Sequence, residues 1–258
     1  MINFPKYNIL FFVLAIPLIT VSFFISYWWI WIILFFILYT VGLTLSSINI
    51  RSNFYMKVIC EGNPENNSIS ITFDDGPNII NTPKVLEILK KNNIKACFFC
   101  IGKNVEVNKE LLKQIYSDGH IIGNHTYSHS YVFDLFSSGK MKTDIQATNN
   151  IIFETINKRP KLFRPPYGVT NPNLAKAIKK INMISIGWSL RSFDTTTKGN
   201  IGKVLKRLEN VKAGDIVLFH DIIDEIPEIL EKFIELVQVK NISFVSIDKM
   251  LNVDVYNE

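Results

Sequence analysis

The chain divides near residue 50 into an apolar first part and a patterned second part. No charged residue occurs over positions 8–46. One membrane-spanning helix needs about 20 apolar residues, and this run is nearly twice that length. We therefore predict a multi-pass membrane protein with two N-terminal transmembrane helices, near 8–26 and 28–46, that turn at Ser26-Tyr27. Three of the four tryptophans gather just after this turn, where interfacial aromatic residues are expected.

Two other readings of this segment fit less well. A cleaved signal peptide is shorter, and no small-residue cleavage site follows this run. A buried hairpin of a water-soluble fold seldom lacks charge over such a length. The expected organisation is therefore a membrane anchor over 1–57, a linker over 58–67 and a catalytic domain over 68–258. Positive charges flank both ends of the hairpin, which favours both ends in the cytoplasm, but the few charges leave the side of the membrane open.

Beyond the linker, short apolar runs alternate with amphipathic stretches. The runs predict strands, which we place at 69–73, 96–101, 120–124, 161–164, 183–187, 215–219 and 242–246. The amphipathic stretches predict helices, which we place at 83–92, 110–117, 174–180, 201–208 and 227–237. Alternation of strand and helix implies parallel βα units. Seven strands favour an α/β fold of the small β/α-barrel type, with a doubly wound open sheet as the alternative.

Composition narrows the functional classes. The chain has 28 basic and 23 acidic residues, which gives a net charge of +5, and its basic residues form no dense run. Nothing here points to a nucleic-acid partner. A slightly basic surface would suit an anionic bilayer, and it equally suits an ordinary solvated surface. The three cysteines cannot form a complete disulfide framework, and Cys97 and Cys100 fall on opposite faces of one strand, so buried free thiols are expected.

Reactive side chains follow the predicted strands. The active site of a β/α barrel forms at the carboxyl ends of its strands, so residues that follow different strands can meet there. Five predicted strands are followed or closed by such residues: Asp74 and Asp75, His125 and His129, Arg164, Trp188 and Asp194, and His220 with Asp221. Placement of nearly every histidine and paired acid at one edge is hard to obtain by chance.

A metal site is the first hypothesis from these residues. His125 and His129 are four apart, so on a helical turn both imidazoles would face one ion. With a carboxylate they form a set that suits zinc and an open water position, although non-haem iron and other divalent metals use the same ligands. Surface histidines are the simpler alternative. Likewise, Asp74-Asp75 before Gly-Pro could be a polar turn, and His220 could be either a structural strand-end residue or a general acid.

Five ordered segments together resemble the polysaccharide deacetylase family, the NodB-homology or carbohydrate esterase family 4 domain. They are Thr72-Phe-Asp-Asp-Gly-Pro77, His125-Thr-Tyr-Ser-His129, Arg164-Pro-Pro-Tyr167, Trp188-Ser-Leu-Arg-Ser-Phe-Asp194 and Ile216-Val-Leu-Phe-His-Asp221. The resemblance covers roughly residues 68–250. It implies a distorted (β/α)7 barrel, in agreement with the seven predicted strands.

The resemblance also implies roles. Asp75, His125 and His129 would bind a divalent metal, zinc before cobalt, nickel, manganese or iron. Asp74 would be the general base for the metal-bound water, and Arg164 would hold it. His220 would protonate the leaving amine while Asp194 tunes its pKa. The amide of Tyr167 would stabilise the oxyanion, and Tyr167 and Trp188 would wall the sugar groove. Thr195 stands where the family often has Trp, which puts sugar contacts in doubt.

The implied function is hydrolysis of N-acetyl groups on an amino-sugar polymer or oligomer of the peptidoglycan, chitooligosaccharide or exopolysaccharide type. Expected partners are that glycan and the lipid bilayer; no oligomeric state is predicted. One alternative is a deacetylase of a small intracellular N-acetyl compound, which cytoplasmic topology would favour. Another is a binding protein that keeps the site without turnover.

Overall fold

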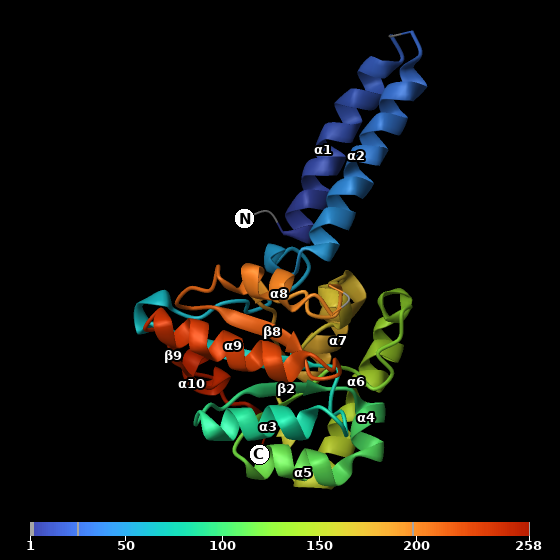
Figure 1. Ribbon diagram of the computed structural model, residues 1–258. Helices are drawn as coiled ribbons and strands as arrows, with labels where there is room; N and C mark the ends of the chain where they lie inside the picture. The colour runs from blue at the N-terminus through green and yellow to red at the C-terminus, as the bar shows by residue number, and fades with distance from the viewer. Residues whose placement is uncertain (1–2, 25, 198, 258) are drawn as a thin grey trace.

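The computed structural model describes residues 3–24, 26–197 and 199–257. Figure 1 shows a helical hairpin that projects from a compact body, with strands inside that body and helices around them.

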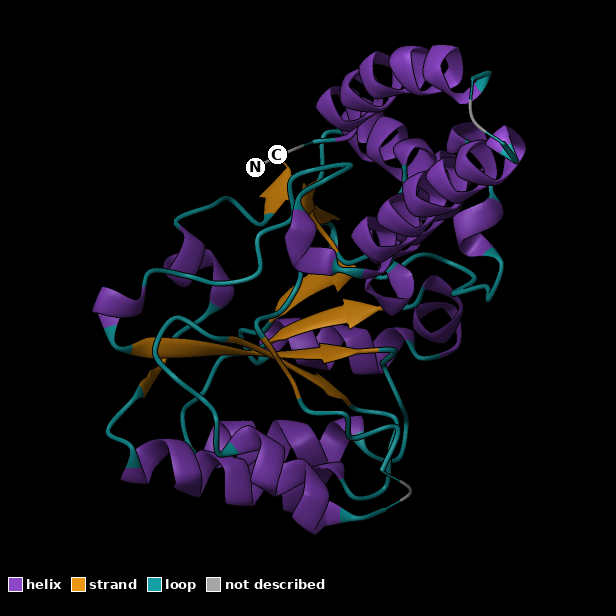
Figure 2. Ribbon diagram, turned by 90° about the horizontal axis from the view of Figure 1, so that it is seen from above, coloured by secondary structure: helices purple, strands orange, loops and turns teal. Residues whose placement is uncertain are grey.

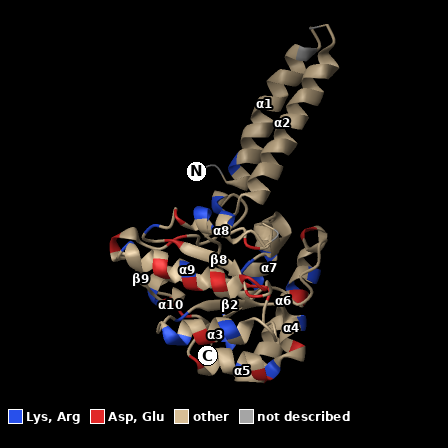
Figure 3. Cartoon of the chain, in the orientation of Figure 1, with Lys and Arg blue, Asp and Glu red and all other residues tan. Residues whose placement is uncertain are grey.

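The hairpin consists of helices α1 (Phe4–Ser22) and α2 (Trp28–Ile48). The two helices pack through stacked rings, among them Tyr7 on Tyr39 at 5.4 Å. Both are long and apolar enough to cross a membrane, and the body covers almost none of their surface: the apolar windows are 11% and 0% buried. The body of the protein therefore does not bury this hairpin as a core element. Figure 3 shows this part almost free of Lys, Arg, Asp and Glu.

The body is built on one curled parallel sheet. Within the described residues it has eight strands, in the order β6-β5-β3-β2-β1-β8-β7, with β9 beside the start of β1. Their bounds are β1 Ser68–Asp74, β2 Cys97–Cys100, β3 Ile121–Asn124, β5 Leu162–Phe163, β6 Ile184–Ser185, β7 Leu190–Arg191, β8 Ile216–His220 and β9 Ser243–Phe244. The strands β4 (Arg159–Pro160) and β10 (Tyr256–Asn257) form a separate antiparallel pair. The predicted α/β fold of distorted (β/α)7 type is confirmed.

Helices cover the outside of this sheet, as Figure 2 shows. They are α3 Thr82–Lys91, α4 Gly102–Val107, α5 Lys109–Ser117, α6 Ser138–Ile156, α7 Pro172–Ile181, α8 Ile201–Leu208 and α9 Ile226–Val239. The short helix α10 (Ile247–Leu251) packs instead on the inner face, where Ile247 and Met250 join the cluster that contains Cys97 and Phe99. Five of the outer helices correspond to predicted amphipathic stretches. The pattern did not predict α6, which buries only a sparse stripe that includes Met141, Ile145 and Ile152. Most of its other residues are polar, so its hydrophobic period is weak.

Two of the core's buried clusters lie on opposite faces of the sheet. Inside the curl, Phe99, Leu162 and Ile216 pack together, and Cys97 lies among them. Cys100 belongs to the larger core between the sheet and the outer helices. The two thiols therefore lie on opposite faces, as predicted, and both are buried and free. Burial raises the pKa of both thiols, which makes them unreactive.

The segment that follows the hairpin closes the open side of the curl. The Ile59 amide donates to the Ser185 carbonyl at 2.9 Å, and the Gly187 amide donates to the Ile59 carbonyl at 2.8 Å. Farther along, the Gly62 amide donates to the Gly214 carbonyl at 2.8 Å. Residues 58–62 thus bridge β6 to the start of β8. Because backbone hydrogen bonds fix this segment to the sheet, it also holds the base of the hairpin beside the barrel.

Candidate active site

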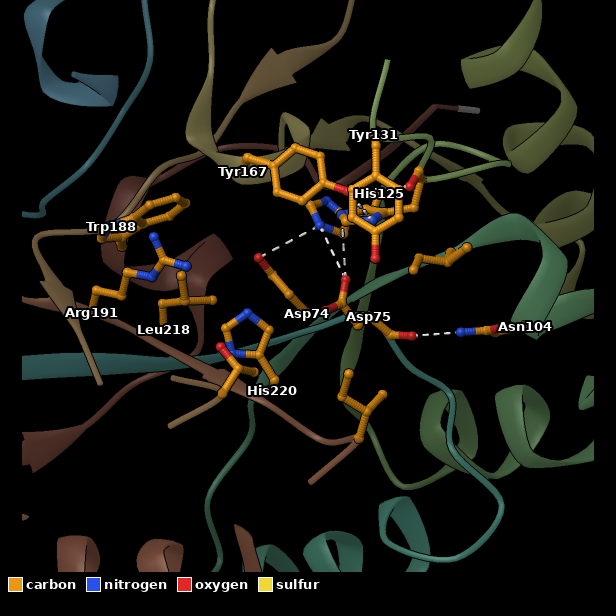
Figure 4. A pocket seen from close by; sticks show the side chains of 14 residues that line it. Asp74, Asp75, Asn104, His125, Tyr131, Tyr167, Trp188, Arg191, Leu218 and His220 are labelled. Carbon is orange, nitrogen blue, oxygen red and sulfur yellow. Dashed lines mark hydrogen bonds and ion pairs between the residues drawn. The ribbon is translucent and has the colours of Figure 1, made fainter. Parts of the chain in front are cut away.

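Asp75, His125 and His129 meet at the carboxyl end of the sheet. The Nε2 atoms of His125 and His129 lie 3.6 Å and 3.5 Å from the Asp75 Oδ1 atom. One potential ligand atom from each residue lies within 4.8 Å of the other two. Asp75 follows β1 and His125 follows β3, so parallel strands bring together side chains that are 50 positions apart in the chain. Figure 4 shows Asp75 and His125 turned toward one another.

The two histidines do not stand on a helical turn, contrary to the expectation from their spacing. Residues 125–130 form an irregular loop, in which Thr126 and His129 have φ of 66° and 43°. Asn124 holds this loop, since its Oδ1 accepts the Thr126 amide at 2.8 Å. Asp144 on α6 accepts the Tyr127 amide at 2.7 Å. The ligand set is therefore shaped by tertiary hydrogen bonds rather than by helical periodicity.

Asp74 and Arg164 form a buried ion pair beneath the ligand set. Arg164 Nη1 donates to Asp74 Oδ1 at 2.8 Å, and the Arg164 residue is fully buried. Burial raises the pKa of Asp74, but the charges of Arg164, His125 and His220 outweigh it, so the net pKa is lowered. Arg164 also donates to the carbonyls of Ile186 and Gly187. Asp74 is thus held ionised, with its second oxygen 3.8 Å from the His125 Nε2 atom.

His220 and Asp194 form a second buried pair at the site. The His220 Nδ1 atom lies 2.8 Å from Asp194 Oδ1, and the His220 amide donates to Asp194 Oδ2 at the same distance. Burial disfavours the imidazolium, yet the hydrogen bond and charge of Asp194 more than offset burial and raise the His220 pKa. An Asp-bound Nδ1 leaves Nε2 as the atom that can face a reactant. In the view of Figure 4, Asp74 lies between His125 and His220.

These groups open into one cavity of about 410 Å³. Tyr167, Trp188 and Thr195 line it, together with Tyr131 and Arg191. Tyr131 is 91% exposed and stacks on Tyr167 with ring centroids 6.0 Å apart. Exposed aromatic faces suit the apolar faces of sugar rings. Tyr167 and Trp188, which were predicted as walls of the sugar groove, thus line this cavity. Tyr131, two residues after His129, lines it as well and was not predicted.

Three further polar or charged residues, none of them predicted as a site residue, contribute to the site. Asn104 on α4 donates to the Asp75 carbonyl at 2.7 Å and lines the cavity. Thr72 accepts from Arg164 at 2.8 Å. Arg191 lies beside Trp188, as Figure 4 shows. Thr72 and Arg191 belong to motifs found in the sequence, so their motif membership was a usable signal. Nothing in the sequence marked Asn104.

Backbone strain collects at this site. Most described non-glycine residues with positive φ are asparagines, which tolerate the left-handed region. Apart from Tyr27 in the hairpin turn, the exceptions are Asp75, Thr126, His129 and Tyr167 at the site, and Phe193, which directly precedes Asp194. Such conformations cost about 1–3 kcal/mol each and persist where the surroundings impose them. Their clustering indicates that side-chain placement here is maintained against local preference.

The three ligand residues fit a divalent metal. His125 Nδ1 lies 2.8 Å from the Arg164 carbonyl, which leaves Nε2 free for an ion. Burial, followed by the neighbouring His125, lowers the His129 pKa to about 4, so this imidazole is neutral and able to ligate. The set offers two nitrogens and one carboxylate, beside an open cavity. That combination suits a hydrolytic zinc site, and it also suits other divalent first-row metals.

Comparisons with known proteins agree with the geometry. A family profile described as polysaccharide deacetylase matches residues 61–185. A peptidoglycan-N-acetylglucosamine deacetylase of Bacillus cereus is 41% identical over 155 residues, which are 59% of this chain and 72% of that protein. A chitooligosaccharide deacetylase of Azorhizobium caulinodans is 32% identical over 155 residues, 60% of this chain and 73% of that protein.

A solved structure extends the likeness to the whole body. The crystal structure of the Bc1960 peptidoglycan N-acetylglucosamine deacetylase matches with a TM-score of 0.73 at 30% identity, covering 78% of this chain and 95% of that one. The resemblance seen in the sequence is confirmed: the chain belongs to the polysaccharide deacetylase family, carbohydrate esterase family 4, a family of carbon–nitrogen hydrolases.

Proposed function

We propose that this protein removes acetyl groups from N-acetylated amino sugars of a glycan, in a metal-dependent hydrolysis at the Asp75, His125 and His129 site. One observation carries the proposal. Two proton-transfer groups, each fixed by its own charged partner, open into the cavity that the ligand set also faces. The relatives named above for peptidoglycan N-acetylglucosamine and for chitooligosaccharides support an N-acetylglucosamine-containing substrate.

The geometry supports a role for each of these residues. Asp75, His125 and His129 would hold the divalent ion, zinc in the first place, with cobalt, nickel, manganese or iron as the alternatives. When bound, that ion supplies Lewis acidity for the amide carbonyl and lowers the pKa of water. Asp74, kept ionised by Arg164, accepts the proton of the attacking water. The Tyr167 backbone N–H donates to the carbonyl oxygen as it gains negative charge.

His220 completes the reaction. The amine of an amide is a poor leaving group until its nitrogen is protonated. His220, whose pKa Asp194 raises, donates a proton to that nitrogen while the carbon–nitrogen bond breaks. The products are acetate and the free amino sugar. Tyr131, Tyr167 and Trp188 would hold the sugar, with Thr195 leaving one side of the cavity wider than a tryptophan would.

We further propose that residues 1–57 anchor the enzyme in a bilayer as a two-span hairpin and that residues 68–258 form the catalytic domain. The length and apolar character of α1 and α2 support this proposal, as do their uncovered apolar side chains. The 58–67 segment, proposed as the connection between the two, is closely tied to the sheet through Ile59 and Gly62. The anchor and the domain would therefore move together rather than on a free tether.

The test is acetate release by the full chain in detergent, with chitotetraose and a peptidoglycan fragment as substrates. Activity should appear with the divalent ion, disappear with a chelator and return when metal is added back. The Asp74→Asn variant is the matched control, since it changes one atom of the base. No release from any N-acetylglucosamine substrate, with or without metal, would favour the non-catalytic binding role instead.

A further inference from the structure

A second cavity lies between the end of the hairpin and the active site. Its volume is about 250 Å³, and its lining includes Ile48, the last residue of α2. Tyr167, Trp188 and Arg191 line both this cavity and the catalytic one. The two cavities therefore share a wall. A ligand that occupies both would reach from the base of the hairpin to the metal ligands.

Three arginines make this second cavity cationic. Arg51, Arg191 and Arg207 line it, and none of its lining residues is acidic. Arg51 is engaged by Glu61 at 2.6 Å, with both side chains about half exposed. Arg191 and Arg207 form no ion pair with any carboxylate in the described parts of the chain. Two positive charges in this cavity are thus left without an acidic partner.

The two guanidinium groups that lack an acidic partner are positioned by an aromatic ring and a backbone carbonyl. Both groups lie over the Phe193 ring, whose centroid is 5.1 Å from the Arg191 Cζ and 4.4 Å from the Arg207 Cζ. Arg207 Nε donates to the Arg191 carbonyl, which leaves its two terminal nitrogens available. The buried Nε of Arg191 has no hydrogen-bond partner among the described residues. Fixed guanidinium groups with free donors are the preferred protein ligands of phosphate oxygens.

We propose that this pocket binds the phosphate or diphosphate of a lipid-linked N-acetylated amino sugar, which places the sugar in the catalytic cavity. This proposal rests on the deacetylase function proposed above. In such a molecule the acetamide is on C2 and the phosphate on C1 of the same ring, so the two groups are neighbours. The acetamide would therefore occupy the catalytic cavity while the phosphate occupies the second cavity, which shares a wall with it.

The hairpin favours a lipid as the carrier of the phosphate. If α2 crosses a bilayer, its end lies at the level of the lipid headgroups, where a lipid-borne phosphate also lies. The exposed side chains of Leu45 and Ile48, 59% and 60% accessible, offer an apolar path for the lipid chain beside the pocket. A sugar nucleotide would supply the same phosphate chemistry without using this apolar surface.

The test compares substrates on the full chain in detergent micelles. The substrates are farnesyl-diphosphate-linked N-acetylglucosamine, UDP-N-acetylglucosamine, chitotetraose and a muropeptide that carries carboxylates. We expect kcat/KM for the farnesyl compound to exceed that for chitotetraose by about tenfold or more, the factor of one charge-assisted hydrogen bond. The Arg207→Gln variant should remove most of this preference through KM. Lys206→Gln is the matched control, because it removes a charge from the same helix outside the pocket.

A binding measurement separates the pocket from the metal. In metal-depleted protein, titration calorimetry should detect farnesyl diphosphate binding that Arg207→Gln weakens about tenfold and Lys206→Gln leaves within twofold. Equal kcat/KM for farnesyl-linked and phosphate-free sugars would overturn the proposal while leaving deacetylation intact. So would an arginine-dependent preference for the muropeptide, or a preference for the UDP-sugar over the farnesyl compound. Failure to release acetate from every substrate would instead refute the deacetylase function itself.

Discussion

The Asp74 carboxylate and the Arg164 guanidinium, 90 positions apart, are joined by a 2.8 Å hydrogen bond in the interior of the curled sheet. The same guanidinium donates to Thr72 on β1 and to the Gly187 carbonyl after β6. The Arg164 side chain therefore connects Asp74, the general base of the proposed reaction, to both sides of the barrel. Its removal should affect folding and catalysis together.

Arg164→Met should lower the free energy of unfolding by about 3–5 kcal/mol, because it leaves the buried Asp74 charge unpaired. Urea denaturation of the variant measures this loss. The double variant Arg164→Met/Asp74→Asn removes the stranded charge and should recover part of the stability. If the single variant is as stable as the wild type, the pair has no structural role.

Asp74→Asn should retain the metal and lose turnover by about 10²–10⁴-fold, since the amide cannot accept a proton from water. Elemental analysis of the purified variant and acetate release measure the two effects separately. Substantial loss of metal would show that the division of labour between Asp74 and Asp75 is wrong.

His129→Ala should reduce bound metal, because only two ligands remain in a set of three. Metal content after dialysis against a defined zinc buffer is the measurement. His120→Asn is the matched control: His120 is buried but accepts the Ala96 amide at 3.1 Å, away from the site. Normal stoichiometry in His129→Ala would refute its role as a ligand.

Asp194→Asn should move the alkaline limb of the kcat/KM pH profile to lower pH. Burial by itself lowers the pKa of His220, and the hydrogen bond and charge of Asp194 raise it above the ordinary value. An acid with a raised pKa stays protonated as the pH increases; without the Asp194 charge, the pKa falls and the proton is lost earlier. Asp224 accepts a hydrogen bond from Asn81 instead, so the control variant Asp224→Asn should leave the limb in place.

A fluorescent protein fused after residue 258 should fluoresce in the cytoplasm, because basic residues flank both ends of the hairpin. Protease treatment of intact and permeabilised cells gives an independent readout. A fusion that is digested in intact cells would place the domain outside and overturn this orientation.

Strand positions, and with them the place of the candidate site residues at the strand ends, were largely predictable from the chain. The apolar runs that became β1, β3 and β8 were each found to within one residue at their ends, since buried parallel strands are short and continuous in hydrophobicity. Because the strand ends were placed correctly, the polar residues that follow them could be identified as candidates for the site. By contrast, α6 was not predicted, because a helix that buries few side chains leaves a weak period.

What the sequence determined by itself is the order of elements, the apolar hairpin and the set of reactive residues, because hydrophobic period and local chemistry are properties of neighbouring positions. Tertiary structure alone decided how distant residues meet. It set His125 and His129 on a strained loop, joined Arg164 to Asp74, and laid the 58–62 segment across the barrel beside the hairpin. Those contacts depend on strand register and curl, which no local pattern encodes.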